Sequence, residues 1–582
     1  MATAARRQKA VSNQASLDFS VTPEPDDPVD TPEPAQAGGP RRNARSNSKK
    51  KTSGRRTKAP VTRQRATAQS MAGQQREISV SEFFTKNRHL LGFDSPTKAL
   101  LTTIKEAVDN SLDACEEADI LPDLYVEISP ASRQENRYRV IVEDNGPGIV
   151  EAQVPRIFGK LLYGSKFHRM RQSRGQQGIG ISAAGMYGQL TTGKPVIIES
   201  RIGEKHPAQH FELVIDTLKN EPQIKRQREA DWGEKTHGTR VEIELEGTYK
   251  GGRHGVDAYL RQTALANPHV RLTYKDPKGE STRYERAIDT LPEEALEIKP
   301  HPYGVEVGML LRMAKETKSR QLKAFFQTEF SRVGPKAATA IIEQAGLSTT
   351  TSPRRVTTDA AERLITAIRN TKIPAPPTNC LSPIGEDRIL ASLREQIDAD
   401  FYTAVTRTPS VYRGNPFQIE VGLAYGGDLP HDELATVYRY ANRVPLQYQA
   451  GACATTKSVL QTNWRSYQLQ QSRGALPTAP LIVMVHIASV WVPFTSESKE
   501  AVAGYDEIVK EMKLALQDAG RRLARFIRKG QRERDAAKKR KYIEKYIPHI
   551  GIALQEILGL TEEQEEEIVV TLSDTLERSR KM

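Results

Sequence analysis

The sequence predicts an α+β protein of several domains, and three observations support this prediction. The chain has 582 residues, enough for roughly three or four domains of ~100–200 residues each. Strand and helix patterns mix within residues 77–302 and again within 379–504, and a helical segment at 303–378 separates these two regions. A last helical region spans 505–582, and a tail at 1–76 precedes them all.

The tail at 1–76 has the composition of a disordered, basic segment. It is rich in Pro, Ala, Ser, Arg and Gln, so it cannot bury enough apolar surface to offset the entropy of ordering. It carries 15 Lys/Arg against 6 Asp/Glu, a net +9, and residues 521–545 carry 12 against 3, again +9. The whole chain is +13, so the rest is −5 (13 − 9 − 9). Two such segments favour a polyanion such as double-stranded DNA; the alternative is solvated arms.

Cysteine usage and hydropathy indicate the compartment. Cys115, Cys380 and Cys453 form no C-x-x-C pair, which argues against a disulfide framework or a zinc site. The longest apolar run, LIVMVHIASVWVPF at 481–494, has 14 residues; it is too short to span a bilayer and is typical of a strand. The basic N-terminus has no apolar signal region. We therefore expect a cytoplasmic, nucleoid-associated protein that does not bind a membrane.

The first element of the mixed region is a helix at 94–120. Ser95 or Asp94 can cap it, and Pro96 suits its first turn. Its apolar side comes from Leu100, Leu101, Ile104, Val108 and Leu112.

Strands and further helices follow. Alternating apolar residues predict strands at 137–143 and 238–247. Helices fill 303–376, and a proline-rich link, IPAPPTN, follows them. From Tyr505 to about Tyr546 a helical pattern without proline would extend roughly 60 Å. Its length and basic charge predict a stalk rather than a core element.

Three polar motifs succeed one another over about 75 residues. Glu106, Asn110 and Asp113 have i, i+4, i+7 spacing, which places them on one face of the first helix. A strand then ends in EDNGPGI, where Asp144 enters a glycine turn, and RGQQGIGIS follows at 174–182. This loop matches neither the G-x-G-x-x-G order nor a P-loop, which needs Gly-Lys-Ser/Thr. Each motif alone is compatible with a solvated face or a surface loop, but their combination favours a nucleotide site.

Together the motifs resemble the GHKL (Bergerat) nucleotide-binding fold, which gyrase B, Hsp90, MutL and histidine kinases share. EAVDNSLDA matches the first motif, DNGPGI the second and GQQGIG the third. The resemblance implies an α/β sandwich that binds ATP. It implies that Glu106 is the general base, that Asn110 is the Mg²⁺ ligand through an amide oxygen suited to a hard cation, and that Asp144 reads the adenine amine.

The resemblance also assigns the rest of the site. Gly148 would let adenine pack against the backbone, and Thr239 in GTR matches a threonine near adenine. Ser165 and Lys166 would add contacts upstream of the loop. Backbone N–H groups of the loop would wrap the phosphates and hinge an ATP lid, and its residues are Gly175, Gln176, Gln177, Gly178, Ile179, Gly180, Ile181 and Ser182.

The rest of the chain resembles B subunits of topoisomerase VI, the type IIB DNA topoisomerases. PSVYRGNPFQIEVGLAYGG, RYANRVPLQYQAGACATTKSV and PFTSESKEAV carry this resemblance, which runs from about 77 to 550. It implies a helix-two-turns-helix domain at 303–378, a ribosomal-S5-like transducer at 379–504 and a long stalk helix with C-terminal helices in 505–582. Lys499 would reach the γ-phosphate from the transducer; without the resemblance it would be an exposed loop lysine.

The function implied is an ATP-driven clamp. ATP would close a homodimer around one duplex, using residues 77–93, and the stalk would act on the topoisomerase VI A subunit in an A2B2 heterotetramer. The resemblance implies that the A subunit cuts the DNA with a tyrosine, and none of the 19 tyrosines of this chain has a recognisable nuclease context. Asp398-Ala399-Asp400 lacks the Glu-Gly partner of a gyrase-type cleavage domain and is predicted to lie on a helix surface.

Two alternatives remain open. A non-hydrolysing structural subunit of a DNA cleavage complex should have lost Glu106, Asn110 or a loop glycine, and all are present. Another GHKL machine, a mismatch-repair ATPase or a chaperone, is disfavoured by the helical insert and by the motifs at 410–460.

Overall fold

The computed structural model describes residues 68–72 and 78–578, with gaps at 132–135, 165–168, 176–177, 218, 253 and 497. The chain divides into two compact units, 1–75 and 76–582. In the first unit, Ala68–Ala72 forms helix α1. The prediction of a disordered tail at 1–76 otherwise falls outside the described residues.

An eight-stranded sheet is the centre of the first mixed region, in the order β5-β4-β3-β6-β2-β1-β7-β8. β1 and β7 run parallel, and the other neighbouring strands run antiparallel. Both predicted strands are confirmed, as β2 and β6. The strands are β1 (Asp123–Pro130), β2 (Arg137–Asp144), β3 (Val196–Arg201), β4 (Ala208–Asp216), β5 (Glu221–Ala230), β6 (Gly238–Glu246), β7 (Arg271–Lys275) and β8 (Ser281–Tyr284).

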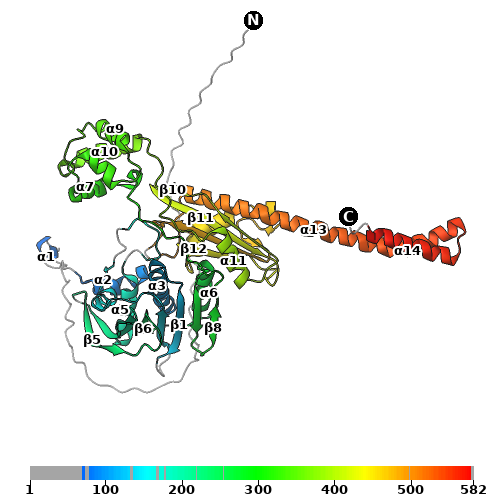
Figure 1. Cartoon of the computed structure of the whole chain (residues 1–582), viewed down its shortest axis with the longest axis horizontal. Helices are drawn as coiled ribbons and strands as arrows, with labels where there is room; N and C mark the ends of the chain where they lie inside the picture. The colour runs from blue at the N-terminus through cyan, green and yellow to red at the C-terminus, as the bar shows by residue number, and fades with distance from the viewer. Residues whose placement is uncertain are drawn as a thin grey trace, which may run out of the picture. The chain divides into compact units, whose positions relative to one another are not determined.

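Helices pack against this sheet and share one apolar core with it (Figure 1). The predicted helix is α3: Ser95 Oγ accepts the Lys98 N–H at 3.3 Å, and Pro96 opens the first turn. Its apolar side is buried and meets alternate residues of β1. The helices are α2 (Val80–Lys86), η1 (Arg88–Leu91), α3 (Pro96–Glu117), η2 (Glu151–Gln153), α4 (Val154–Gly159), α5 (Gly180–Thr192) and α6 (Val256–Ala266).

The segment predicted to be helical folds around a core of its own, in which Phe325, Phe326 and Phe330 pack ring against ring. Its helices are η3 (Pro302–Gly304), α7 (Val307–Glu316), α8 (Leu322–Glu329), α9 (Pro335–Gln344), η4 (Pro353–Arg355) and α10 (Thr358–Asn370).

A second sheet has the order β10-β11-β16-β12-β13, with β9 also paired to β11. The apolar run at 481–494 contains β16, and every residue of this strand is buried. Helix α11 packs on one face, and α12 and α13 belong to the core on the other, which explains the unbroken apolar sequence. The elements are α11 (Glu386–Gln396), β9 (Phe401–Thr406), β10 (Ser410–Tyr412), β11 (Asn415–Tyr425), β12 (Thr436–Ala441), β13 (Val444–Pro445), η5 (Ala450–Ala452), α12 (Ala454–Gln461), η6 (Trp464–Tyr467), β14 (Gln470–Gln471), β15 (Pro477–Thr478) and β16 (Leu481–Ser489).

Helix α13 (Asp506–Leu558) has 53 residues, about 80 Å at ~1.5 Å per residue. The prediction that it lies outside any core is wrong for its first part, since residues from Ile508 to Ile527 complete the core of the second sheet. The helix also continues past Tyr546 and through Pro548, and α14 (Glu562–Arg578) packs against it. An interior proline removes one N–H donor and clashes with the preceding turn, but it can kink a helix without ending it, and Pro548 does not mark the helix end.

Two further observations complete the fold. Asp398 and Asp400 lie in the loop between α11 and β9, not on a helix surface as predicted, and Asp400 accepts the Gly427 N–H at 3.0 Å. None of the described helices is long and apolar enough to cross a membrane.

Candidate functional site

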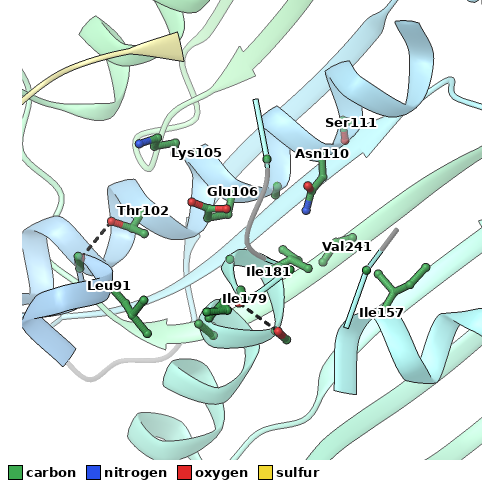
Figure 2. A pocket seen from close by; sticks show the side chains of 18 of the residues that line it. Leu91, Thr102, Lys105, Glu106, Asn110, Ser111, Ile157, Ile179, Ile181 and Val241 are labelled. Atoms are coloured by element: carbon green, nitrogen blue, oxygen red, sulfur yellow. Dashed lines mark hydrogen bonds between the residues drawn. The ribbon is translucent and has the colours of Figure 1, made fainter. Parts of the chain in front are cut away.

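A cavity of about 500 Å³ is lined by α3, the start of α5 and strands β2 and β6. Figure 2 shows Glu106 and Asn110 projecting into it from α3, with Ile157 of α4 and Val241 of β6 on the other side. Most of the predicted site residues line this one cavity: Glu106, Asn110, Asp144, Gly148, Gly175, Gly178, Ile179, Gly180, Ile181, Ser182, Thr239 and Lys499. The remaining ones, Ser165, Lys166, Gln176 and Gln177, lie outside the described residues.

Glu106 and Asn110 lie one turn apart on α3, beside the loop at 174–182, which we call the glycine loop. A Cβ added at Gly180 would fall 1.7 Å from Glu106 Oε2, and one at Gly175 would fall 3.8 Å from Asn110 Oδ1. Glycine at 180 thus leaves room for the carboxylate, and a side chain there would displace the end of Glu106. Asp113, predicted on the same face, is not part of the cavity, because its carboxylate binds Arg174 at 2.8 Å.

Asp144 ends β2 at the base of the cavity and is held by three donors. Its Oδ2 accepts the Ser111 hydroxyl at 2.7 Å, and its Oδ1 accepts the N–H groups of Gly146 at 2.9 Å and Thr239 at 3.2 Å. Burial raises the pKa of Asp144, and the three hydrogen bonds oppose this shift. The carboxylate is thus fixed in position, with its oxygens facing a defined set of partners.

Two serines of this site were not predicted. Ser111 follows Asn110 directly, so the motif EAVDNSLDA could have identified it. Ser200, at the end of β3, accepts the Ile149 N–H at 2.8 Å and lies 3.2 Å from Thr239 Oγ1. No local signal marks Ser200, because only sheet pairing brings β3 beside β6.

Gly148 has a backbone reason to be glycine. Its φ is +72°, and an added Cβ would lie 2.1 Å from the Arg201 carbonyl oxygen. The chain therefore needs glycine there to pass close to β3, whether or not a base packs against it.

The glycine loop leads straight into α5. Gly178 has φ +58°, the helix begins at Gly180, and Ile179 at the N-cap gives no side-chain cap. The first N–H groups of α5 thus lack intrahelical partners beside the cavity, an arrangement that binds anions. Ser182 Oγ donates to the Ile179 carbonyl at 3.0 Å and steadies this turn.

Lys499 enters the cavity from the loop after the second sheet. Its φ is +55°, and its Nζ donates to the carbonyl oxygen of Arg174 at 3.2 Å, next to Gly175. Gln447 and Tyr448 also reach the cavity from this region, and the sequence did not predict them. The cavity is therefore lined by both mixed regions of the chain.

This fold and site define the class of the protein: it is an ATPase of the histidine kinase-, DNA gyrase B- and HSP90-like type, whose family model matches residues 96–285. A second model, the transducer of the topoisomerase VI B subunit, matches residues 376–539. The B subunit of the type 2 DNA topoisomerase 6 of Archaeoglobus fulgidus is 48% identical over 489 residues, which cover 84% of this chain and 80% of the relative. That of Methanococcoides burtonii is 48% identical over 492 residues, 84% of this chain and 79% of the relative. The chain belongs to the family of type 2 DNA topoisomerase 6 B subunits.

The structural comparison adds little to this result. The 43K ATPase domain of Thermus thermophilus gyrase B covers 80% of this chain and 98% of its own, at 13% identity and a TM-score of 0.37. The family models and the sequence relatives establish the GHKL ATPase fold and the function of an ATP-dependent DNA topoisomerase subunit.

Proposed function

We propose that this chain is the ATP-driven clamp of a type IIB topoisomerase, which couples hydrolysis to passage of one duplex through a break made by an A subunit. One observation carries the proposal: Glu106, Asn110, the glycine loop and Lys499 line a single cavity to which both mixed regions contribute. A nucleotide bound there would contact both regions at once. Its hydrolysis would therefore change the contacts between them.

The residues that line the cavity would have different roles in ATP binding and hydrolysis. Glu106 would take a proton from the attacking water, and the loop N–H groups with the start of α5 would hold the phosphates. Asp144 would accept from the exocyclic amine of adenine. Asn110 fits Mg²⁺, because its amide oxygen faces the loop at Gly175 and no described residue hydrogen-bonds to it. The ion would supply charge neutralisation at the phosphates.

Partners follow from charge and exposure. Residues 521–545 carry +9, all within α13, which suits double-stranded DNA. Beyond Ile527 this helix exposes apolar side chains that suit an A subunit: Tyr542, Ile543, Tyr546, Ile550 and Ile557. We propose an ATP-dependent homodimer within an A2B2 heterotetramer, cytoplasmic and associated with the nucleoid.

The test is ATP hydrolysis with and without duplex DNA, alone and with a candidate A subunit, followed by relaxation of supercoiled plasmid. We expect DNA to stimulate hydrolysis and the complex to relax plasmid only with ATP and Mg²⁺. Relaxation that proceeds without hydrolysis would favour the alternative, a structural subunit that organises a cleavage complex.

A further inference from the structure

We propose that Arg443 is a positioning residue that carries the state of the glycine loop into the second sheet, through a buried network with Glu116 and Arg174. This inference rests on the proposed function, since it concerns how nucleotide in the same cavity affects the transducer. It adds a route distinct from Lys499, because none of its three side chains lines the cavity.

The network starts at the loop. Arg174 directly precedes Gly175, and its guanidinium is only 4% exposed. Nη1 donates to Asp113 Oδ1 at 2.8 Å, and Nη2 donates to Glu116 Oε1 at 2.6 Å and to Asn267 Oδ1 at 2.6 Å. Arg174, the first residue of the glycine loop, is thus bound to α3 by buried, charge-assisted hydrogen bonds.

Glu116 is shared between the two regions of the chain. Its Oε2 accepts from Arg174 Nη1 at 3.0 Å and from Arg443 Nη1 at 3.2 Å, and His269 Nε2 lies 2.8 Å from Oε1. Burial alone would raise the pKa of Glu116, but the two guanidiniums and His269 hold it well below its usual range. One carboxylate therefore bridges two arginines that lie 269 positions apart (443 − 174).

Arg443 extends the network into the second sheet. Its backbone N–H donates to His486 Nε2 at 3.0 Å, and His486 Nδ1 then donates to Glu420 Oε2 at 2.8 Å. Glu420 also accepts the N–H groups of Ile384 and Gly385, each at 2.7 Å. The bonds are thus continuous from the glycine loop through β12–β13 to β16, β11 and the start of α11.

The turn between β12 and β13 places Arg443 against Glu116. Asn442 and Arg443 form the two-residue connection between β12 and β13, with φ of +49° and +66°. Such hairpin turns favour Asn and Gly, so an arginine at the second position is conformationally costly and its side chain has a specific use. Asn442 Nδ2 donates to the Ser173 carbonyl at 3.0 Å, so the same turn also holds the backbone next to Arg174.

A second contact supports the coupling. Arg443 Nη2 donates to the Ser382 carbonyl at 2.7 Å and also contacts Ser382 Oγ. Gln172, two residues before Arg174, donates to the same carbonyl at 2.9 Å, and its Oε1 accepts the Ser382 N–H at 2.8 Å. Movement of the loop therefore has to be shared with Arg443 and Ser382 or break these bonds.

The test is hydrogen–deuterium exchange on the full chain, with ADP and with a non-hydrolysable ATP analogue. The segments compared are the loop at 171–182 and two transducer segments, 382–386 and 439–446. The variants are R443A and R443K. The matched control is R261K, because Arg261 also joins the two regions, through the Gln396 carbonyl at 2.9 Å, but lies outside the network.

In the wild type we expect the analogue to change exchange in all three segments relative to ADP. Both Arg443 variants should keep the loop response and lose at least half of the transducer response, while R261K keeps both. Lysine should not rescue, since it cannot bond Glu116 and Ser382 in a fork. If R443A does not fold, the exchange of R443K tests the inference instead. E116Q is a further variant, because it weakens the Glu116–Arg443 ion pair from the Glu116 side.

Two results would overturn the inference: an Arg443 variant with the wild-type transducer response, or a wild type whose transducer segments do not respond. A wild type whose loop fails to respond to either nucleotide would instead contradict the proposed ATP site. The two failures are therefore distinguishable.

Discussion

At the scale of single residues, Glu106 lies opposite the start of α5. The carboxylate faces the backbone of Gly180, where a Cβ would collide with it, and it lines the cavity together with Asn110. In the proposed function this carboxylate takes a proton from water, while Asp144 holds the base and the glycine loop holds the phosphates. Its removal should therefore affect chemistry more than binding.

We accordingly expect Glu106→Gln to bind ATP with near-wild-type affinity and to hydrolyse it ~10²–10⁴-fold more slowly. The measurement is steady-state turnover alongside a nucleotide titration. Glu280→Gln, at an exposed turn between β7 and β8, serves as the control. Turnover within tenfold of the wild type would remove Glu106 from the base role.

His269 gives a prediction on pH at the same scale. Its ring is 1% exposed and contacts Glu116 at 2.8 Å, and burial lowers its pKa despite that contact, with Arg443 and Arg174 acting in the same direction as burial. The unfolded chain takes up a proton near the usual value of about 6.5, while the folded chain does so only at lower pH. The stability from neutral His269 is thus fully present above pH 6.5 and is lost as pH falls below it.

Thermal unfolding of the wild type and of His269→Gln checks this sign. The difference in Tm between them should be larger at pH 7.5 than at pH 5.5, because glutamine does not titrate and other groups are common to both proteins. A difference that stays constant would mean that folding does not shift the pKa of His269, and one that grows on acidification would mean that folding raises it.

At the scale of elements, sequence patterns located those whose signals are local. Helix α3 begins where Ser95 and Pro96 predicted, and the strand before Asp144 ends where the glycine turn begins. The core-forming part of α13 was missed because the length and basic charge of the whole helix were taken to indicate a stalk. Its buried residues Ile508, Met512 and Leu516 do recur at helical spacing, but only the second sheet shows what they pack against.

The residues of the site also fall into those that a local motif identifies and those that only the fold brings there. Motif residues such as Asn110 could be identified from spacing. Gln447 lines the cavity, whereas Ser200 and Arg443 contact residues around it, and all three arrive through pairings between distant segments. The Glu116–Arg443 contact joins positions 327 residues apart, and a single sequence contains no periodicity over that distance. Packing of the two sheets, rather than any local pattern, creates these contacts.

For the elements, we predict that the basic part of α13 binds duplex DNA. Lys538 and Lys539 are exposed on the helix, so their charges are free to meet phosphates. Changing both to Gln should weaken binding to duplex DNA of any sequence and reduce the slope of log affinity against log salt by ~0.9 for each phosphate that is no longer neutralised. Fluorescence anisotropy over a salt series measures this slope. The control changes Lys205 and Lys278, which are exposed at turns between strands, to Gln. Equal effects of the two pairs would mean that net charge, rather than a contact made by α13, sets the affinity.

At the scale of the whole molecule, the proposed function requires hydrolysis to alter how the two sheets are linked. The loop at Arg174 is held from the second sheet by Lys499, Asn442 and, through Glu116, by Arg443. Of these, Lys499 also lines the cavity, and in the proposed function its ammonium would exchange the Arg174 carbonyl for a terminal phosphate. Such an exchange is a ligand-biased two-state element.

Lys499→Ala should therefore leave ATP affinity largely intact, slow hydrolysis and abolish strand passage with the A subunit. Lys499→Arg should not restore it fully, because a planar guanidinium is a poor substitute for a compact ammonium in a narrow site. Lys510→Ala, exposed in the first turns of α13, controls for loss of a nearby charge. Relaxation of supercoiled plasmid by the reconstituted complex is the decisive measurement. Since Lys499 acts at the cavity and Arg443 acts behind the loop, wild-type relaxation by Lys499→Ala would show that Lys499 does not carry the coupling, and would leave Asn442 and Arg443 as the links.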